Sequence, residues 1–152
     1  MKYMKLMIFN IAICLLVGIL PPSPTFAQGI ELTVIGNVQS VPSEMDMNQL
    51  IAVLKGEKMR WEDGSRVKIA LMKTNTPIGS GTCEKVYNMT GNELNKYFLA
   101  LVFQGKVKAP SFFNSVSDLE NYVAQTPGAI GVSQNTTDNQ LKIILVDGKK
   151  QI

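Results

Sequence analysis

Apolar and polar residues alternate along residues 67–72, V-K-I-A-L-M, so that one side of an extended chain would be more buried than the other. This period of two predicts a strand. A second strand is predicted over residues 31–36, which are rich in apolar and β-branched types and end in glycine. Short apolar runs at residues 129–132 and 141–146, each beside a turn signal, predict two more strands.

Between these strands, apolar residues recur three and four positions apart, which predicts helices. One helix is expected over residues 45–55, with Ser43 as its cap. Another is expected over residues 92–104, and it is apolar on so much of its surface that we expect the rest of the chain to cover it. A third is expected over residues 118–125, capped by Ser117.

A shorter helix is expected over residues 84–89, whereas residues 111–115, S-F-F-N-S, are expected to be a loop. The resulting order is strand, helix, strand, several helices and two strands. Such alternation favours an α/β fold with a mixed central sheet flanked by helices.

The first residues of the chain have the pattern of a secretory signal peptide. Lys2 and Lys5 precede an apolar run at residues 6–20, and small residues follow it. The run is short for a membrane-spanning helix. We therefore expect residues 1–27 to be a cleaved signal peptide and residues 28–152 to form one domain in the periplasm or outside the cell. An uncleaved N-terminal anchor is the alternative.

Charge and composition narrow the function. Because Lys2 and Lys5 leave with the signal peptide, 13 of the 15 basic residues remain against 12 acidic ones. No basic stripe is visible in the sequence, so no nucleic-acid partner is expected. The chain has no histidine, and Cys83 is the one cysteine after residue 27. We therefore expect no enzyme activity, no cofactor and no metal. Cys83 is expected to be a buried thiol, and Trp61 a packing anchor.

Residues 76–84 read T-P-I-G-S-G-T-C-E and directly precede the short predicted helix. If Ser80, Gly81 and Thr82 open that helix, their N–H groups have no partner within it. Free N–H groups at a helix N-terminus attract anions, and glycine lets an oxyanion approach closely. The alternative is that Ser80 or Thr82 only caps the helix. The sequence leaves both interpretations open.

Three ordered motifs resemble the phosphate-type solute-binding proteins, the periplasmic components of phosphate importers. They are L-I-A-V-L-K-G-E-K-M-R-W-E-D-G-S-R-V, T-P-I-G-S-G-T and V-A-Q-T-P-G-A-I-G-V. The resemblance implies a single lobe of the type II periplasmic-binding-protein-like fold, similar to the second lobe of those receptors. It also implies anion binding by Ser80, Gly81 and Thr82, with Thr76 at the edge of the site. Thr76 stands where the family has an arginine.

Two hypotheses follow from these observations. The first is an exported solute-binding-like protein that binds phosphate or another small oxyanion, with a transporter component as a further partner. The second is an envelope protein-interaction module that keeps the fold without binding a ligand. Under either hypothesis the membrane is contacted only through the signal segment.

Overall fold

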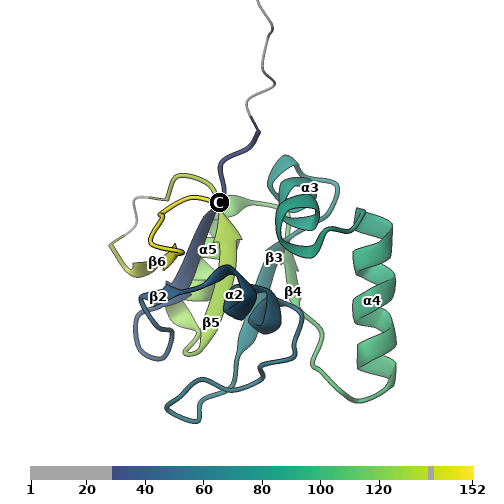
Figure 1. Cartoon of the computed structure of the whole chain (residues 1–152), viewed down its shortest axis with the longest axis horizontal. Helices are drawn as coiled ribbons and strands as arrows, with labels where there is room; N and C mark the ends of the chain where they lie inside the picture. Colours follow the sequence, from purple (N-terminus) through teal and green to yellow (C-terminus); the bar gives the residue numbers. More distant parts are fainter. Residues whose placement is uncertain (1–28, 137–138) are drawn as a thin grey trace, which may run out of the picture.

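The computed structural model describes residues 29–136 and 139–152, which form one mixed sheet with helices around it (Figure 1). The predicted signal peptide lies outside these described residues. None of the helices in the described part is long and apolar enough to span a membrane. The strands are β1 (Thr33–Asn37), β2 (Glu44–Met45), β3 (Lys68–Met72), β4 (Ser111–Phe113), β5 (Ala129–Ser133) and β6 (Leu141–Val146).

The six strands are ordered β2-β6-β1-β5-β3-β4. β1 runs antiparallel to both of its neighbours, β5 and β6. β3 runs parallel to β5 and β4, and β2 runs parallel to β6. The expectation of an α/β fold with a mixed sheet is confirmed. The helices are α2 (Met47–Leu54), α3 (Pro77–Thr82), the π-helix η1 (Cys83–Tyr87), α4 (Gly91–Phe103) and α5 (Val116–Gln125).

The core lies on the two faces of the central strands. All five residues of β1 and all five of β5 are buried, which is expected where helices cover both faces of a sheet. α5 packs against β5, β1 and β3 and buries Leu119 and Val123. α2 lies on the other side of the sheet, and α4 stands at the side of the molecule beside α3 (Figure 1).

The structure corrects two predicted helix caps. Asp46, not Ser43, caps α2: its side chain accepts a hydrogen bond from the Gln49 N–H at 2.8 Å. Residues 44 and 45 pair with β6 instead of starting the helix. Likewise Ser115, two positions before Ser117, caps α5 by accepting from the Asp118 N–H at 3.1 Å. In both places a neighbouring residue competes for the same role.

Two further expectations are wrong. Residues 111–113 are not a loop, because they form β4 and pair with Ala70, Leu71 and Met72 of β3. The helix predicted over residues 92–104, observed as α4, is not well covered, since Leu99, Val102 and Phe103 are exposed.

Trp61 is a packing anchor, as predicted. It is only 4 % exposed, and its indole N–H donates to the carbonyl oxygen of Gly128 at 2.9 Å. A Cβ at Gly128 would overlap the carbonyl oxygen of Arg66, and its φ of +78° lies in the left-handed region. The T-P-G motif therefore serves close packing between two segments that are distant in sequence.

Candidate functional site

α3 begins earlier than the sequence analysis predicts. It starts at Pro77, with Thr76 as its N-cap, and not at Ser80. The Thr76 hydroxyl accepts from the Gly79 N–H at 3.0 Å and donates to the Lys73 carbonyl at 2.8 Å. A proline at the first helical position has no N–H to offer. The tip of α3 is therefore largely closed by its own cap.

The N–H groups expected to bind an anion lie inside this helix. The Ser80 N–H donates to the Thr76 carbonyl at 2.8 Å. Gly81 and Thr82 belong to the last turn of α3, and η1 continues directly from it. The premise that Ser80, Gly81 and Thr82 open a helix is wrong. Anion binding by these residues stays a prediction, but it has lost the row of free main-chain donors on which it depended.

Two of the predicted anion-binding side chains already form hydrogen bonds within the protein. The Thr82 hydroxyl is buried and donates to the Ile78 carbonyl at 2.7 Å. The Thr76 hydroxyl is engaged in the cap. The Ser80 side chain is exposed, and its hydroxyl has no hydrogen bond to any described residue. Of the predicted set, Ser80 is the residue that can still reach a ligand from solvent.

Cys83 follows Thr82 as the first residue of η1 and is 2 % exposed. Burial raises the pKa of its thiol above the ordinary value. A thiol that is both hidden and neutral is not a nucleophile at neutral pH. The prediction of a buried structural thiol is confirmed.

A shallow depression of about 430 Å³ lies beside Ser80 and carries acidic groups. Glu84 and Glu93 both line it, and no basic residue is among the described residues that do. The Glu93 carboxylate accepts from the Thr90 N–H at 2.7 Å and from its hydroxyl at 2.8 Å. These hydrogen bonds lower the pKa of Glu93, so it stays charged near neutral pH. Two carboxylates beside Ser80 disfavour a bound anion.

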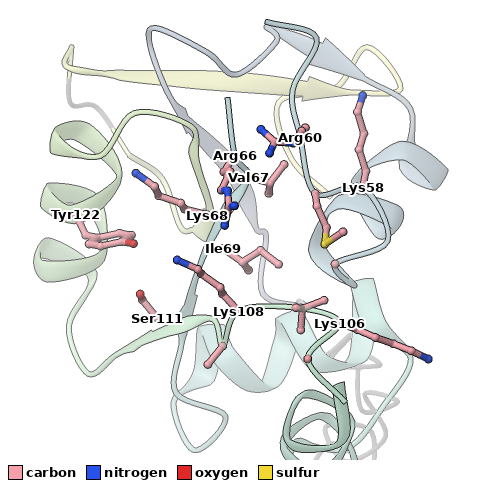
Figure 2. A pocket seen from close by; sticks show the side chains of 15 residues that line it. Lys58, Arg60, Arg66, Val67, Lys68, Ile69, Lys106, Lys108, Ser111 and Tyr122 are labelled. Carbon is pink, nitrogen blue, oxygen red and sulfur yellow. The ribbon is translucent and has the colours of Figure 1, made fainter. Parts of the chain in front are cut away.

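A larger cleft of about 680 Å³ lies at the other end of β3, around Lys68 and Ile69 (Figure 2). We call it the basic cleft, because six basic side chains and no acidic one are found among the described residues that line it. No basic stripe is visible along the sequence, whereas folding gathers these six basic side chains around one cleft. The basic residues are Lys58, Arg60, Arg66, Lys68, Lys106 and Lys108.

The sequence contains a signal for this cleft, but it is easily missed. Four of the basic residues lie in the segment 58–68 and two in the segment 106–108. The first segment also contains Glu62 and Asp63, so its charge looks balanced along the chain. In the structure neither carboxylate lines the cleft. Folding therefore separates charges that are mixed in the sequence.

No protein-family model matches the chain, and no curated protein matches it either. Solved structures do match. A phosphate ABC transporter substrate-binding protein from Clostridium perfringens, with bound phosphate, aligns with a TM-score of 0.60 at 10 % identity, over 78 % of this chain and 46 % of that one. An ABC-type phosphate transport receptor from Vibrio cholerae aligns with a TM-score of 0.59 at 13 % identity, over 80 % of this chain and 48 % of that one.

PstS from Borrelia burgdorferi aligns with a TM-score of 0.59 at 16 % identity, over 78 % of this chain and 48 % of that one. The chain thus spans less than half the length of these receptors. Identities this low establish the fold alone. The resemblance found in the sequence is confirmed at that level: the chain has the fold of a single periplasmic-binding-protein-like lobe, of the kind found in phosphate transport receptors.

Proposed function

We propose that this chain is an exported, solute-binding-like module that works by contacting another protein and is not a free-standing phosphate receptor. Its place in the envelope rests on the signal-peptide pattern of residues 1–27. The observation that carries the proposal is an uncovered apolar surface on α4.

This surface, the α4 outer face, consists of Leu99, Val102 and Phe103. Their side chains are 57 %, 38 % and 83 % exposed. Residues three and four apart are neighbours on a helix, so the three side chains form one patch. α4 buries Leu94 and Phe98 on its inner side, so its attachment to the lobe does not need the outer face. Grouped exposed apolar side chains mark protein contact sites.

The charges around this face indicate what kind of partner fits it. Lys96 precedes Leu99 by one helical turn, and Lys106 follows Phe103 closely; both are exposed. A complementary surface would offer an apolar groove bordered by acidic side chains.

Oxyanion binding at Thr76, Ser80, Gly81 and Thr82 is the second candidate function. It is favoured by the exposed Ser80 hydroxyl and by the likeness to phosphate receptors. Two observations argue against it: the hydrogen-bond donors of α3 are already bonded within the protein, and two carboxylates lie beside Ser80. This candidate requires saturable phosphate binding that Ser80→Ala weakens.

The experiment for the proposed function is position-specific photocrosslinking in the native host. A photoreactive amino acid replaces Phe103 or Leu99, and Lys149 serves as an exposed control on the C-terminal tail. We expect the same discrete protein adduct from positions 103 and 99, none from 149, and loss of the position-103 adduct when Leu99→Asp is added. No adduct at 103 and 99, or equal adducts at all three positions, would overturn the proposal.

A further inference from the structure

We propose that the basic cleft receives an extended acidic segment of a partner protein, in which apolar residues lie between the carboxylates. This inference rests on the proposed function, namely that the lobe works by contacting another protein. The cleft is at the opposite end of β3 from α3, so it is separate from the predicted oxyanion site.

The cleft exists because strand pairing stops short. β4 pairs with β3 only from Ala70 onward, where Ala70 is opposite Ser111. Before that point Lys68 and Ile69 have β5 on one side and no β4 residue on the other. The segment 105–109 leads from α4 to β4 and forms the far wall. The cleft therefore lies along a stretch of β3 that has no β4 partner, and an extended chain can bind beside such a strand edge.

The positive charges of the cleft have no acidic partner among the described residues. None of the six basic side chains forms an ion pair with any described residue. In Figure 2 the charged ends of Lys68 and Lys108 lie on the same side of the cleft as the hydroxyls of Ser111 and Tyr122. The guanidinium of Arg66 lies at the centre of the lining (Figure 2). Lys58 and Lys106 point away from this centre and form the rim (Figure 2). The cleft therefore combines a cationic centre with a cationic border.

Two arginines are held opposite each other next to this centre. Arg60 and Arg66 form an isolated antiparallel bridge. Two hydrogen bonds fix the hairpin that carries them. The backbone N–H of Trp61 donates to the Ser65 carbonyl at 2.9 Å, and the Arg60 guanidinium donates to the Gly64 carbonyl at 2.7 Å. Like charges directly opposite each other on paired strands are destabilising. Carboxylates bound here would relieve that repulsion.

The lining favours an acidic peptide over a compact anion. Lys68 and Lys108 are long, exposed side chains that no hydrogen bond to a described residue holds in place. A single phosphate could contact these lysines only if several flexible side chains were ordered around one point, and each ordered side chain costs binding free energy. An extended segment can instead make separate contacts along the cleft.

The apolar part of the lining supports a peptide more than a nucleic acid. Val67, Ile69 and Val107 also line the cleft and can contact apolar side chains between the carboxylates. Single-stranded nucleic acid binds by stacking on exposed aromatic rings. Trp61 is buried, and Tyr122 is half-buried. Gly105 lines the cleft and lies two residues after Phe103, the last residue of α4, so one partner could contact both the cleft and the α4 outer face.

The test measures binding of a fluorescent peptide of Glu-Glu-Leu repeats to the purified protein by anisotropy, with Gln-Gln-Leu repeats as the neutral control. We expect saturable binding of the acidic peptide that weakens as salt rises, and none of the neutral one. The double variant Lys68→Glu, Lys108→Glu should weaken binding at least about tenfold. The matched control, Lys149→Glu, Lys150→Glu, changes net charge equally on the exposed tail and should weaken it less than about twofold.

Four outcomes would overturn the inference: no binding of the acidic peptide, equal binding of the neutral one, equal loss in both double variants, or tighter binding of tripolyphosphate or oligo-deoxythymidine. Both substituted lysines are exposed, and unchanged melting curves would show that the variants fold. The milder pair Lys68→Gln, Lys108→Gln should give an intermediate loss. Failure of this test with an intact position-103 crosslink would remove the cleft inference alone.

Discussion

The indole N–H of Trp61 lies 2.9 Å from the carbonyl oxygen of Gly128 and donates to it, across 67 positions of sequence. This buried bond ties the hairpin that carries Arg60 and Arg66 to the start of β5. It thereby holds one wall of the basic cleft. The family-like W-E-D-G and T-P-G-A-I-G motifs of the sequence meet at this contact.

Replacing Trp61 should destabilise the whole lobe. Trp61→Phe keeps an apolar ring but removes the indole N–H, so the Gly128 carbonyl keeps only its hydrogen bond from the Lys68 backbone N–H at 3.1 Å. We expect a loss of roughly 0.5–1.5 kcal/mol in the free energy of unfolding. Urea unfolding followed by circular dichroism measures it. Met59→Leu is the control, because Met59 is 55 % exposed on the same hairpin. Equal stability of the Trp61→Phe and control variants would contradict the role given to this bond.

Gly128 and Gly148 form a matched pair for the same contact. Both have positive φ, +78° and +75°, but a Cβ at Gly128 would overlap the Arg66 carbonyl, whereas nothing lies within 4 Å at Gly148. Gly148→Ala should cost about 1–2 kcal/mol from the left-handed backbone alone. Gly128→Ala should cost clearly more, because a backbone atom must also move. Equal losses in urea unfolding would show that close packing at Gly128 is unimportant.

Thr76 and Ser80 should differ in what they do for stability. Thr76→Ala removes the N-cap of α3 and should cost about 0.5–2 kcal/mol. Ser80→Ala removes an exposed hydroxyl with no partner among the described residues, and should change stability by less than about 0.5 kcal/mol. Denaturant midpoints of the two variants decide this. A larger loss for Ser80→Ala than for Thr76→Ala would be incompatible with the observed start of α3.

Two phenylalanines of α4 test which side of the helix holds it in place. Phe98 is 4 % exposed and packs edge-on against Tyr87 and Tyr97, whereas Phe103 is 83 % exposed. Phe98→Ala should cost about 3–5 kcal/mol. Phe103→Ala should cost less than about 0.5 kcal/mol and should weaken partner contact instead. Similar losses from thermal unfolding of both variants would mean that the outer face is structural.

Alkaline pH should destabilise the lobe through two buried acids. Burial raises the pKa of the Cys83 thiol above its ordinary 9.0, and it raises that of the Tyr87 hydroxyl above its ordinary 10.0. Between the unfolded and folded pKa values the unfolded chain has lost its proton and the folded chain has kept it. Stability therefore falls as pH rises above about 9, and this contribution is fully present below that value.

Urea midpoints between about pH 8 and about pH 10.5 measure this fall. Cys83→Ala should make the fall of the urea midpoint smaller at the lower end of this pH interval, because the thiol that titrates there is gone. A midpoint that stays constant or rises over this interval would contradict the burial of both groups.

Apolar runs, and the alternation over residues 67–72, made much of the fold predictable. β1, β3, β5 and β6 follow from them, because a strand buried on its faces needs apolar residues whatever its partners are. β2 and β4 were missed, since two or three residues carry no periodicity and pair only because β6 and β3 lie beside them. The caps at Ser43 and Ser117 were misplaced because Asp46 and Ser115 compete for the same role nearby.

The candidate sites were harder to predict. Thr76-Pro77 is itself a helix-start signature, with a cap and then proline at the first position, but the glycines at 79 and 81 directed the prediction to Ser80. The basic cleft was not predictable from local charge. It brings together two segments about forty residues apart in the sequence, and it excludes the carboxylates that neighbour them.

Calorimetric titration with phosphate tests most directly whether the hydrogen-bond donors of α3 are all used within the protein. We expect no saturable heat up to about 10 mM phosphate, well above the ~1 mM Kd that corresponds to about −4 kcal/mol. Ser80→Ala should give the same trace as the unchanged protein. Saturable binding below about 1 mM that Ser80→Ala abolishes would show that the S-G-T turn holds an oxyanion, and would contradict the account.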